Sequence, residues 1–337
     1  MFKKLHHIII AALLLGLLLQ CGCGAGDAAL TVLFTNDVHG MLLPHESYTE
    51  PDAAALGVTE DVGGVCRRAS YIKSVRKYTQ HTVLLLDAGD IFTRGPARRL
   101  EGKPDIELMN LMKYDAAAIG NNEFKGDEYK GKPTPASMDI LAERQKEARF
   151  PFLCANVYKD GKRAFTPYII KEAEGLRIGI FSVTAPSSAS YKSTEGYEFT
   201  DAVDEAAKVV EELKSRTDLI ICLSHAGIID DMVMANRCKD IDLIVGGHTH
   251  TWLPTPLFSA AGRPVRDKNV NGVIVCSAGE YGVATGRIDL KICKQQDGSW
   301  AVGKYTAKLV PMTSEYPDDP EAKAILEKYW KPLGLIK

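Results

Sequence analysis

The sequence has few of the features that mark nucleic-acid-binding, zinc-knuckle and repeat proteins. Its 41 basic and 43 acidic residues leave a net charge of −2, so there is no basic field to attract a nucleic-acid polymer or anionic lipid. No two cysteines have the CxxC spacing, which argues against a zinc knuckle and a thioredoxin-like redox site. Internal repeats and low-complexity tracts are also absent. With 337 residues, 45 % hydrophobic and 25 % charged, the chain has the composition of a globular protein with one large α/β domain or two small ones.

The long apolar run near the start is too short to cross a membrane. It covers residues 8–19, whereas a spanning helix needs about 20 apolar residues. Lysines precede it and small residues follow it, which is the layout of an export signal. We therefore expect residues 1–26 to be a signal peptide and the mature protein to act in the periplasm or cell envelope. Cys21 and Cys23 follow the run as the lipidated cysteine of a lipoprotein does, so we expect a lipid anchor at one of them; ordinary cleavage near Gly26 is the alternative.

Six cysteines remain after the signal segment, and an oxidising compartment would permit disulfides. Three of them lie inside apolar runs and are expected to be buried thiols. The other three could pair or stay free. The first group is Cys154, Cys222 and Cys276, and the second is Cys66, Cys238 and Cys293.

Short apolar runs alternate with amphipathic stretches over the rest of the chain. Continuous apolar runs suit strands that are buried on both faces, and residues 64–78, 137–149 and 202–215 have apolar residues at helical spacing. This alternation predicts an α/β fold. We also expect a helix within residues 317–335 and a hairpin-like pair formed by residues 273–277 and 283–292. The predicted strand runs are 30–35, 82–86, 116–119, 151–155, 176–183, 219–223, 241–245 and 272–276.

Five polar signatures each follow one of these apolar runs. In open α/β sheets the ligand site lies beyond the carboxyl ends of the strands, so we expect the signatures to gather at one edge. Aspartate can bridge two cations and histidine supplies neutral nitrogen, a mixture that suits Mn, Zn, Fe, Co or Ni better than Ca or Mg. Two such ions about 3.5–4 Å apart can clamp both the attacking and the leaving oxygens of an in-line displacement and turn bound water into a hydroxide nucleophile. The signatures are NDVHG at 36–40, DAGD at 87–90, GNNE at 120–123, SHAG at 224–227 and GGHTH at 246–250.

The order and wording of these signatures resemble the 5′-nucleotidase family of the calcineurin-like metallophosphoesterases. The stretch GGVCRRA at 63–69 and the dipeptide AN at 155–156 add to the resemblance, which covers roughly residues 30–310. It implies a four-layer α/β/β/α sandwich as a single domain over residues 27–312, with a C-terminal helix and tail at 313–337. It also implies two divalent metal ions. One would be held by Asp37, His39, Asp90 and His250, and the other by Asp90, Asn121, His225 and His248, with Asp90 bridging.

The third signature departs from the family pattern Gly-Asn-His-Glu-Phe-Asp, in which the His stabilises the transferring phosphoryl group and the Asp orients it. Asn122 stands in place of that His, and Lys125 in place of that Asp. Asn122 could still donate a hydrogen bond to a phosphoryl oxygen but carries no charge, and the lost help is worth roughly 10²- to 10⁴-fold. Lys125 or Arg94 could replace the positive charge, although each is otherwise an ordinary solvated loop charge.

The intact ligand set predicts an exported dinuclear-metal phosphoesterase of 5′-nucleotidase type that hydrolyses small phosphate esters, with nucleotides among the candidates. Two alternatives stay open because both dyad residues are replaced. One is a sulfur-ester hydrolase of the thiohydrolase branch, and the other is a metal-binding envelope scaffold with impaired catalysis. Family members that cleave nucleotides carry a further domain that stacks the base. No counterpart is found in this sequence, so a separate partner chain could supply specificity. Trp252 is the aromatic residue nearest the GGHTH signature and is expected to lie in the core.

Overall fold

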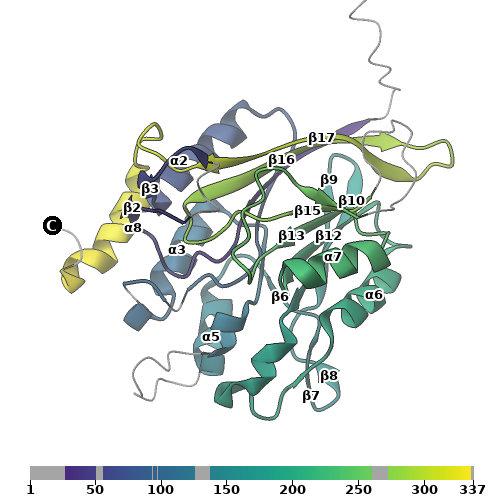
Figure 1. Ribbon diagram of the computed structural model, residues 1–337, viewed down its shortest axis with the longest axis horizontal. Coiled ribbons are helices and arrows are strands. Elements are labelled where there is room, and N and C mark those ends of the chain that lie inside the picture. Colours follow the sequence, from purple (N-terminus) through teal and green to yellow (C-terminus); the bar gives the residue numbers. More distant parts are fainter. Residues whose placement is uncertain are drawn as a thin grey trace, which may run out of the picture.

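Two six-stranded sheets lie face to face in this computed structural model, with helices on their outer faces (Figure 1). The structure describes residues 27–50, 56–92, 94–96, 98–125, 137–259 and 272–334. The predicted four-layer α/β/β/α sandwich is confirmed. The proposed signal segment 1–26, with Cys21 and Cys23, lies outside the described residues. Across the described ranges, none of the helices has both the length and the apolar character that a membrane span requires.

The first sheet has the strand order β17-β16-β1-β4-β5-β6. Strands β1, β4, β5 and β6 run parallel to one another, while β16 pairs antiparallel with β1 and with the edge strand β17. Helices α2, α3, α5 and α8 supply apolar side chains that pack on its outer face. The bounds are β1 Ala28–Thr35, β4 Val83–Asp87, β5 Ala116–Ala118, β6 Phe152–Leu153, β16 Ala284–Lys294, β17 Trp300–Pro311, α2 Val65–Tyr78, α3 Lys103–Met112, α5 Ser137–Glu147 and α8 Pro320–Trp330.

The second sheet has the order β14-β15-β13-β12-β10-β9, and helices α6 and α7 cover its outer face. Its four inner strands are parallel. Both sheets therefore direct the carboxyl ends of parallel strands toward a ligand site of the kind expected from the sequence. The bounds are β9 Tyr168–Ala173, β10 Leu176–Thr184, β12 Leu219–His225, β13 Leu243–Gly246, β14 Leu257–Phe258, β15 Ile274–Cys276, α6 Ala202–Leu213 and α7 Ile228–Arg237.

Alternation of side chains explains why these strands are apolar throughout. In β1, Leu30, Val32 and Phe34 face the core between the sheets, whereas Leu33 faces the helices outside. Every position of such a strand is buried on one side or the other, so a continuous apolar run is what the fold requires. The short elements are β2 Pro44–Ser47, β3 Glu60–Gly63, α4 Asn121–Lys125, β7 Val157–Lys159, β8 Lys162–Arg163, β11 Glu198–Phe199, and the 3₁₀ helices η2 Arg98–Leu100, η4 Pro186–Ser190, η5 Lys192–Thr194 and η6 Lys331–Leu333.

The hairpin expected from residues 273–277 and 283–292 is wrong. Strand β15 pairs with β13 and β14 in the second sheet, whereas β16 pairs with β1 and β17 in the first. The chain crosses between the sheets over residues 277–283, and Asn36 is hydrogen-bonded to this connection. Its side chain donates to the carbonyl of Gly279 at 2.6 Å and accepts from the backbone N–H of Ala278 at 2.8 Å. The true hairpin is β16–β17, whose second strand has no continuous apolar run.

Two smaller expectations can be compared with the structure. The predicted tail helix is α8, which is capped by Asp319 and buries Trp330 against the helical layer. Trp252 is 8 % exposed and packs in a small cluster with Tyr48, as expected for a core residue. All six described cysteines are free and buried, so none of the open pairings forms among them: Cys66, Cys154, Cys222, Cys238, Cys276 and Cys293.

Candidate metal centre

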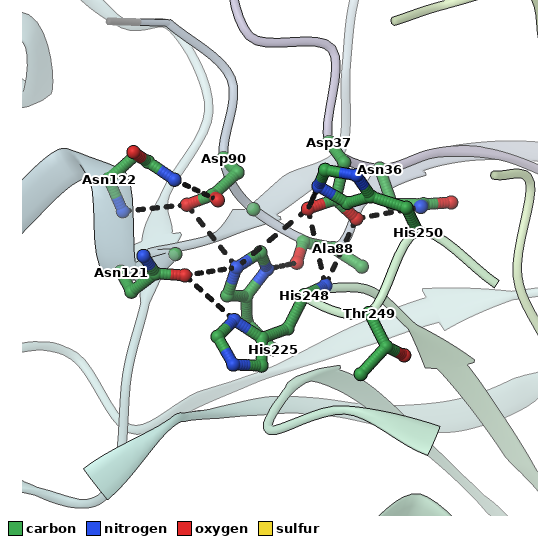
Figure 2. A network of polar contacts seen from close by, with 12 residues as sticks. Asn36, Asp37, Ala88, Asp90, Asn121, Asn122, His225, His248, Thr249 and His250 are labelled. Carbon is green, nitrogen blue, oxygen red and sulfur yellow. Dashed lines mark hydrogen bonds and ion pairs between the residues drawn. The ribbon is translucent and has the colours of Figure 1, made fainter. Parts of the chain in front are cut away.

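The candidate ligands gather beyond the carboxyl ends of strands from both sheets (Figure 2). The segment after β1 supplies two of them, the loop after β4 one, and α4 after β5 another. The second sheet supplies the end of β12 and the loop after β13. The seven residues brought together are Asp37, His39, Asp90, Asn121, His225, His248 and His250.

The backbone at this edge is unusual. Non-glycine residues with positive φ are uncommon, and strained conformations cluster at functional sites. Here five of the seven candidate ligands adopt positive φ, with values between 50° and 75°. The surrounding structure must hold these residues in strained backbone conformations. The strain is therefore accepted in return for the direction in which their side chains point. The five are Asp37, His39, Asp90, His248 and His250.

One half of the centre consists of Asp37, His39 and His250. The Nε2 atoms of the two histidines are 3.1 Å apart, and Nε2 of His250 is 3.4 Å from Oδ1 of Asp37. On its other ring nitrogen, Nδ1, His250 contacts the carboxylate of Glu280, which also accepts a hydrogen bond from the Tyr48 hydroxyl at 3.1 Å. Glu280 therefore fixes the ring and leaves its Nε2 facing the other two residues.

The other half consists of Asp90, Asn121, His225 and His248. Nδ1 of His225 donates to the carbonyl of Ala88 at 2.7 Å. This orients the ring so that Nε2 lies 3.2 Å from Asp90 Oδ1 and 3.1 Å from Asn121 Oδ1. The same amide oxygen lies 2.8 Å from Nδ1 of His248. Lone pairs of nitrogen and oxygen thus converge on a common point.

A divalent cation fits this donor set, because atoms that accept hydrogen bonds face one another and a cation would satisfy them together. Within the described ranges, two groups are close enough to hold an ion: Asp37, His39 and His250, and Asp37, Asp90 and His225. Asp37 belongs to both groups, and Asp90 of the second group also faces the first, with Oδ2 3.8 Å from His39 Nε2 and Oδ1 3.2 Å from His225 Nε2. Asp90 thus approaches a histidine of each group. Its two oxygens can therefore serve the two groups separately.

Charge at the centre is balanced by protons when no cation is present. Burial lowers the pKa of His39 to about 4, so this ring is neutral. Burial also opposes charge on His225 and Asp90, but each stabilises the other, so the pKa of His225 is raised and that of Asp90 lies below its usual range. Burial is likewise outweighed at His250, where Asp37 and Glu280 raise the pKa to about 9. Bound cations would displace these protons.

The three residues suggested for phosphoryl stabilisation lie in different surroundings. Asn122 is buried, and both its backbone N–H, at 2.7 Å, and its side-chain amide donate to the carboxylate of Asp90. Lys125 is exposed, with Nζ 5.9 Å from the centre of the Tyr191 ring. Arg94 is also exposed; its neighbour Gly95 donates its backbone N–H to the carbonyl of His39 at 2.6 Å, and burial together with the charge of Arg94 lowers the pKa of His39. Arg94 thus lies near the half of the centre that contains His39.

Several supporting residues were missed from the sequence. Glu123 accepts four backbone N–H groups around the centre, and Glu280 orients His250. Glu280 could have been found, because it follows an apolar strand run just as the five signatures do. Tyr191, whose hydroxyl accepts from Asn121 Nδ2 at 3.1 Å, lies between two short 3₁₀ turns, and no sequence pattern marks it.

Comparison with known proteins is consistent with this geometry. Residues 30–252 match the calcineurin-like phosphoesterase family, and this range includes all seven candidate ligands. The chain is 30 % identical to the trifunctional nucleotide phosphoesterase protein YfkN of Bacillus subtilis, over 91 % of this chain and 21 % of that protein. A 5′-nucleotidase precursor from Thermus thermophilus superposes with a TM-score of 0.74 at 30 % identity, over 91 % of this chain and 59 % of that one.

A sulfate thiohydrolase, SoxB of Thermus thermophilus, shares the fold with a TM-score of 0.73 at 21 % identity, over 90 % of this chain and 60 % of that one. The chain thus spans about a fifth of the first relative and about three fifths of each of the two solved chains. The family match covers more than half of the chain and includes every strand end at which a candidate ligand is placed. The chain therefore belongs to the calcineurin-like phosphoesterase family of metal-dependent hydrolases.

Proposed function

We propose that this protein is an exported phosphoesterase of 5′-nucleotidase type that uses two divalent ions to hydrolyse small phosphate monoesters, nucleotides among them. The observation that supports this most is the position of Asp90, whose two oxygens face two separate groups of ligands. We assign Asp37, His39, Asp90 and His250 to one ion, and Asp90, Asn121, His225 and His248 to the other. The mixture of imidazole nitrogen and oxygen donors suits Mn, Zn, Fe, Co or Ni.

The protein's own groups would hold the candidate ligands in place. The two bound ions would supply charge to the phosphoryl group and activate the attacking water. Asn122 orients Asp90, the Ala88 carbonyl orients His225, and Glu280 orients His250. Arg94 is placed to offer its positive charge to a substrate phosphate that enters on the His39 side.

Substrate class and location are further parts of the proposal. The relatives YfkN and the Thermus 5′-nucleotidase are named for nucleotide chemistry, which favours nucleotides here. A separate partner chain that binds the base is compatible with the proposal. Export rests on the sequence of residues 1–26, with lipid attachment at Cys21 or Cys23 and a site of action in the periplasm or cell envelope.

A sulfur-ester substrate is the second candidate. It is favoured by the replacement of the family His and Asp by Asn122 and Lys125, and by the fold shared with a sulfate thiohydrolase. An inactive scaffold is less favoured, because a chain that had lost catalysis would have no reason to keep all seven candidate ligands, three of which (Asn121, His225 and His250) are each held by a further contact.

A panel of esters tests the proposed function. The chain from residue 27 onward, loaded with Mn²⁺, should hydrolyse nitrophenyl phosphate and nucleoside monophosphates faster than bis(nitrophenyl) phosphate, as measured by released phenol and phosphate. A monoester fits because its charged oxygens can contact both ions and Arg94. If only a sulfur ester were hydrolysed, the protein would be a thiohydrolase and the proposal would be wrong. No turnover with two ions bound would leave the scaffold reading.

A further inference from the structure

Tyr191 lies against the half of the centre that contains Asn121. Its hydroxyl oxygen accepts a hydrogen bond from Asn121 Nδ2 at 3.1 Å, while Oδ1 of the same amide faces His225 and His248. The tyrosine ring packs at the margin of the core under the helices, and the residue is half-buried. A phenol is thus fixed directly beside a candidate metal ligand and retains access to solvent.

The proton of this hydroxyl is not used by the contact with Asn121. Because the amide nitrogen can only donate, the phenol must accept in this pair and must direct its own O–H elsewhere. Among the residues that the structure describes, none accepts that proton. Tyr191 therefore offers a hydrogen-bond donor beside the candidate site.

Asn122, which occupies the position of the family histidine, is engaged elsewhere. Its side-chain amide and its backbone N–H both donate to Asp90. Lys125, at the position of the family aspartate, lies near the ring of Tyr191 rather than in any recorded contact with Asn122. The residues at the two replaced positions thus have different contacts. Asn122 supports the candidate ligand Asp90, whereas Lys125 brings positive charge toward Tyr191.

We propose that Tyr191 contacts the substrate and donates its O–H to a non-bridging phosphoryl oxygen, taking the place of the missing histidine. This rests on the proposed function. No proton is transferred; the hydrogen bond strengthens as negative charge grows on the phosphoryl oxygens in the transition state. Lys125 adds to this local positive charge without touching the reacting group.

Tyr191→Phe tests this role, because it removes the hydroxyl and keeps the ring. Loss of one such donor is expected to lower kcat/KM for both nitrophenyl phosphate and a nucleoside monophosphate by about 10²-fold. Binding of orthovanadate, a phosphoryl mimic, should weaken by a similar factor in calorimetry, while the metal content stays at that of the wild type. Tyr197→Phe is the matched control: Tyr197 also has a lysine over its ring, Lys159 at 4.7 Å, but no recorded contact with the centre. It should behave as wild type.

Two results would overturn the assignment. Unchanged kcat/KM and vanadate binding in Tyr191→Phe would show that the hydroxyl does not contact the phosphoryl group. Loss of a bound ion in this variant would make Tyr191 a positioning residue for Asn121 instead. A wild-type protein that binds vanadate but hydrolyses no ester would refute the proposed function, and the vanadate affinities of the two variants would still decide the role of Tyr191.

Discussion

Asp90→Asn is expected to remove both bound metal ions and to lower the rate of phosphate-ester hydrolysis by about 10³-fold or more, since several kcal/mol of transition-state stabilisation come from the ions. The two oxygens of this side chain face different sets of ligands, with Oδ2 toward His39 and Oδ1 toward His225. Asparagine keeps the size of the side chain and tolerates the left-handed backbone of this position, where φ is 57°. The substitution therefore removes the negative charge and one metal-binding oxygen but leaves the fold intact.

The matched control for this variant is Asp242→Asn. Asp242 also accepts a backbone N–H, that of Ile220 at 2.9 Å, but it lies just before β13, at the opposite edge of the second sheet. Metal content by elemental analysis and turnover should both remain as in the wild type. If Asp90→Asn retained two ions and most of its activity, the bridging role assigned to Asp90 would be wrong.

Glu123→Ala is expected to destabilise the metal-free protein by ~4 kcal/mol, because it leaves several buried backbone N–H groups without an acceptor. Glu123 is 1 % exposed and accepts from the N–H groups of Gly120, Asp90, Ile91 and Phe92, at distances of 2.8 to 3.4 Å. These contacts tie α4 to the loop after β4, which carries Asp90. Loss of the carboxylate should therefore weaken metal binding as well as lower the free energy of unfolding.

Urea denaturation of the metal-free variants measures this effect. Glu123→Gln retains one accepting oxygen and should lose less stability than Glu123→Ala. Glu174→Ala is the surface control, because Glu174 also accepts a backbone N–H, that of Thr82 at 2.6 Å, but is exposed, so its loss should cost at most about 1 kcal/mol. Equal stability of Glu123→Ala and Glu174→Ala would show that the buried carboxylate does not hold the loop.

The strands and the candidate ligands could be predicted because their cause is local in the sequence. A strand buried on both faces must be apolar at every position, and a ligand at its carboxyl end must follow directly, so Asp37, Asp90 and His225 stand out in the sequence. Strand β17 was not predicted because it is an edge strand, in which Lys304 and Lys308 interrupt the apolar pattern. The hairpin was wrongly predicted because the partners of the two strands are remote in sequence: β15 pairs with β13 and β14, and β16 pairs with β1.

The contacts between the candidate ligands and the residues that orient them could not be predicted, because they join segments that are remote in sequence. The contact of Tyr191 with Asn121 spans 70 residues, and the Tyr48 hydroxyl meets Glu280 across 232. The role of Asn122 was also open, since an amide can turn toward a substrate or toward a ligand. Tertiary placement decides this, with the amide bonded to Asp90.

The most direct test of the dinuclear account is a titration of the metal-free chain with Mn²⁺, in which nitrophenyl phosphate hydrolysis is measured against equivalents added. Asp37 belongs to both groups of ligands and Asp90 faces each of them, so hydrolysis should rise until two equivalents per chain are bound and then level off. Asp90→Asn should stay at background throughout. Saturation at one equivalent, or hydrolysis that is independent of Mn²⁺, would contradict the account.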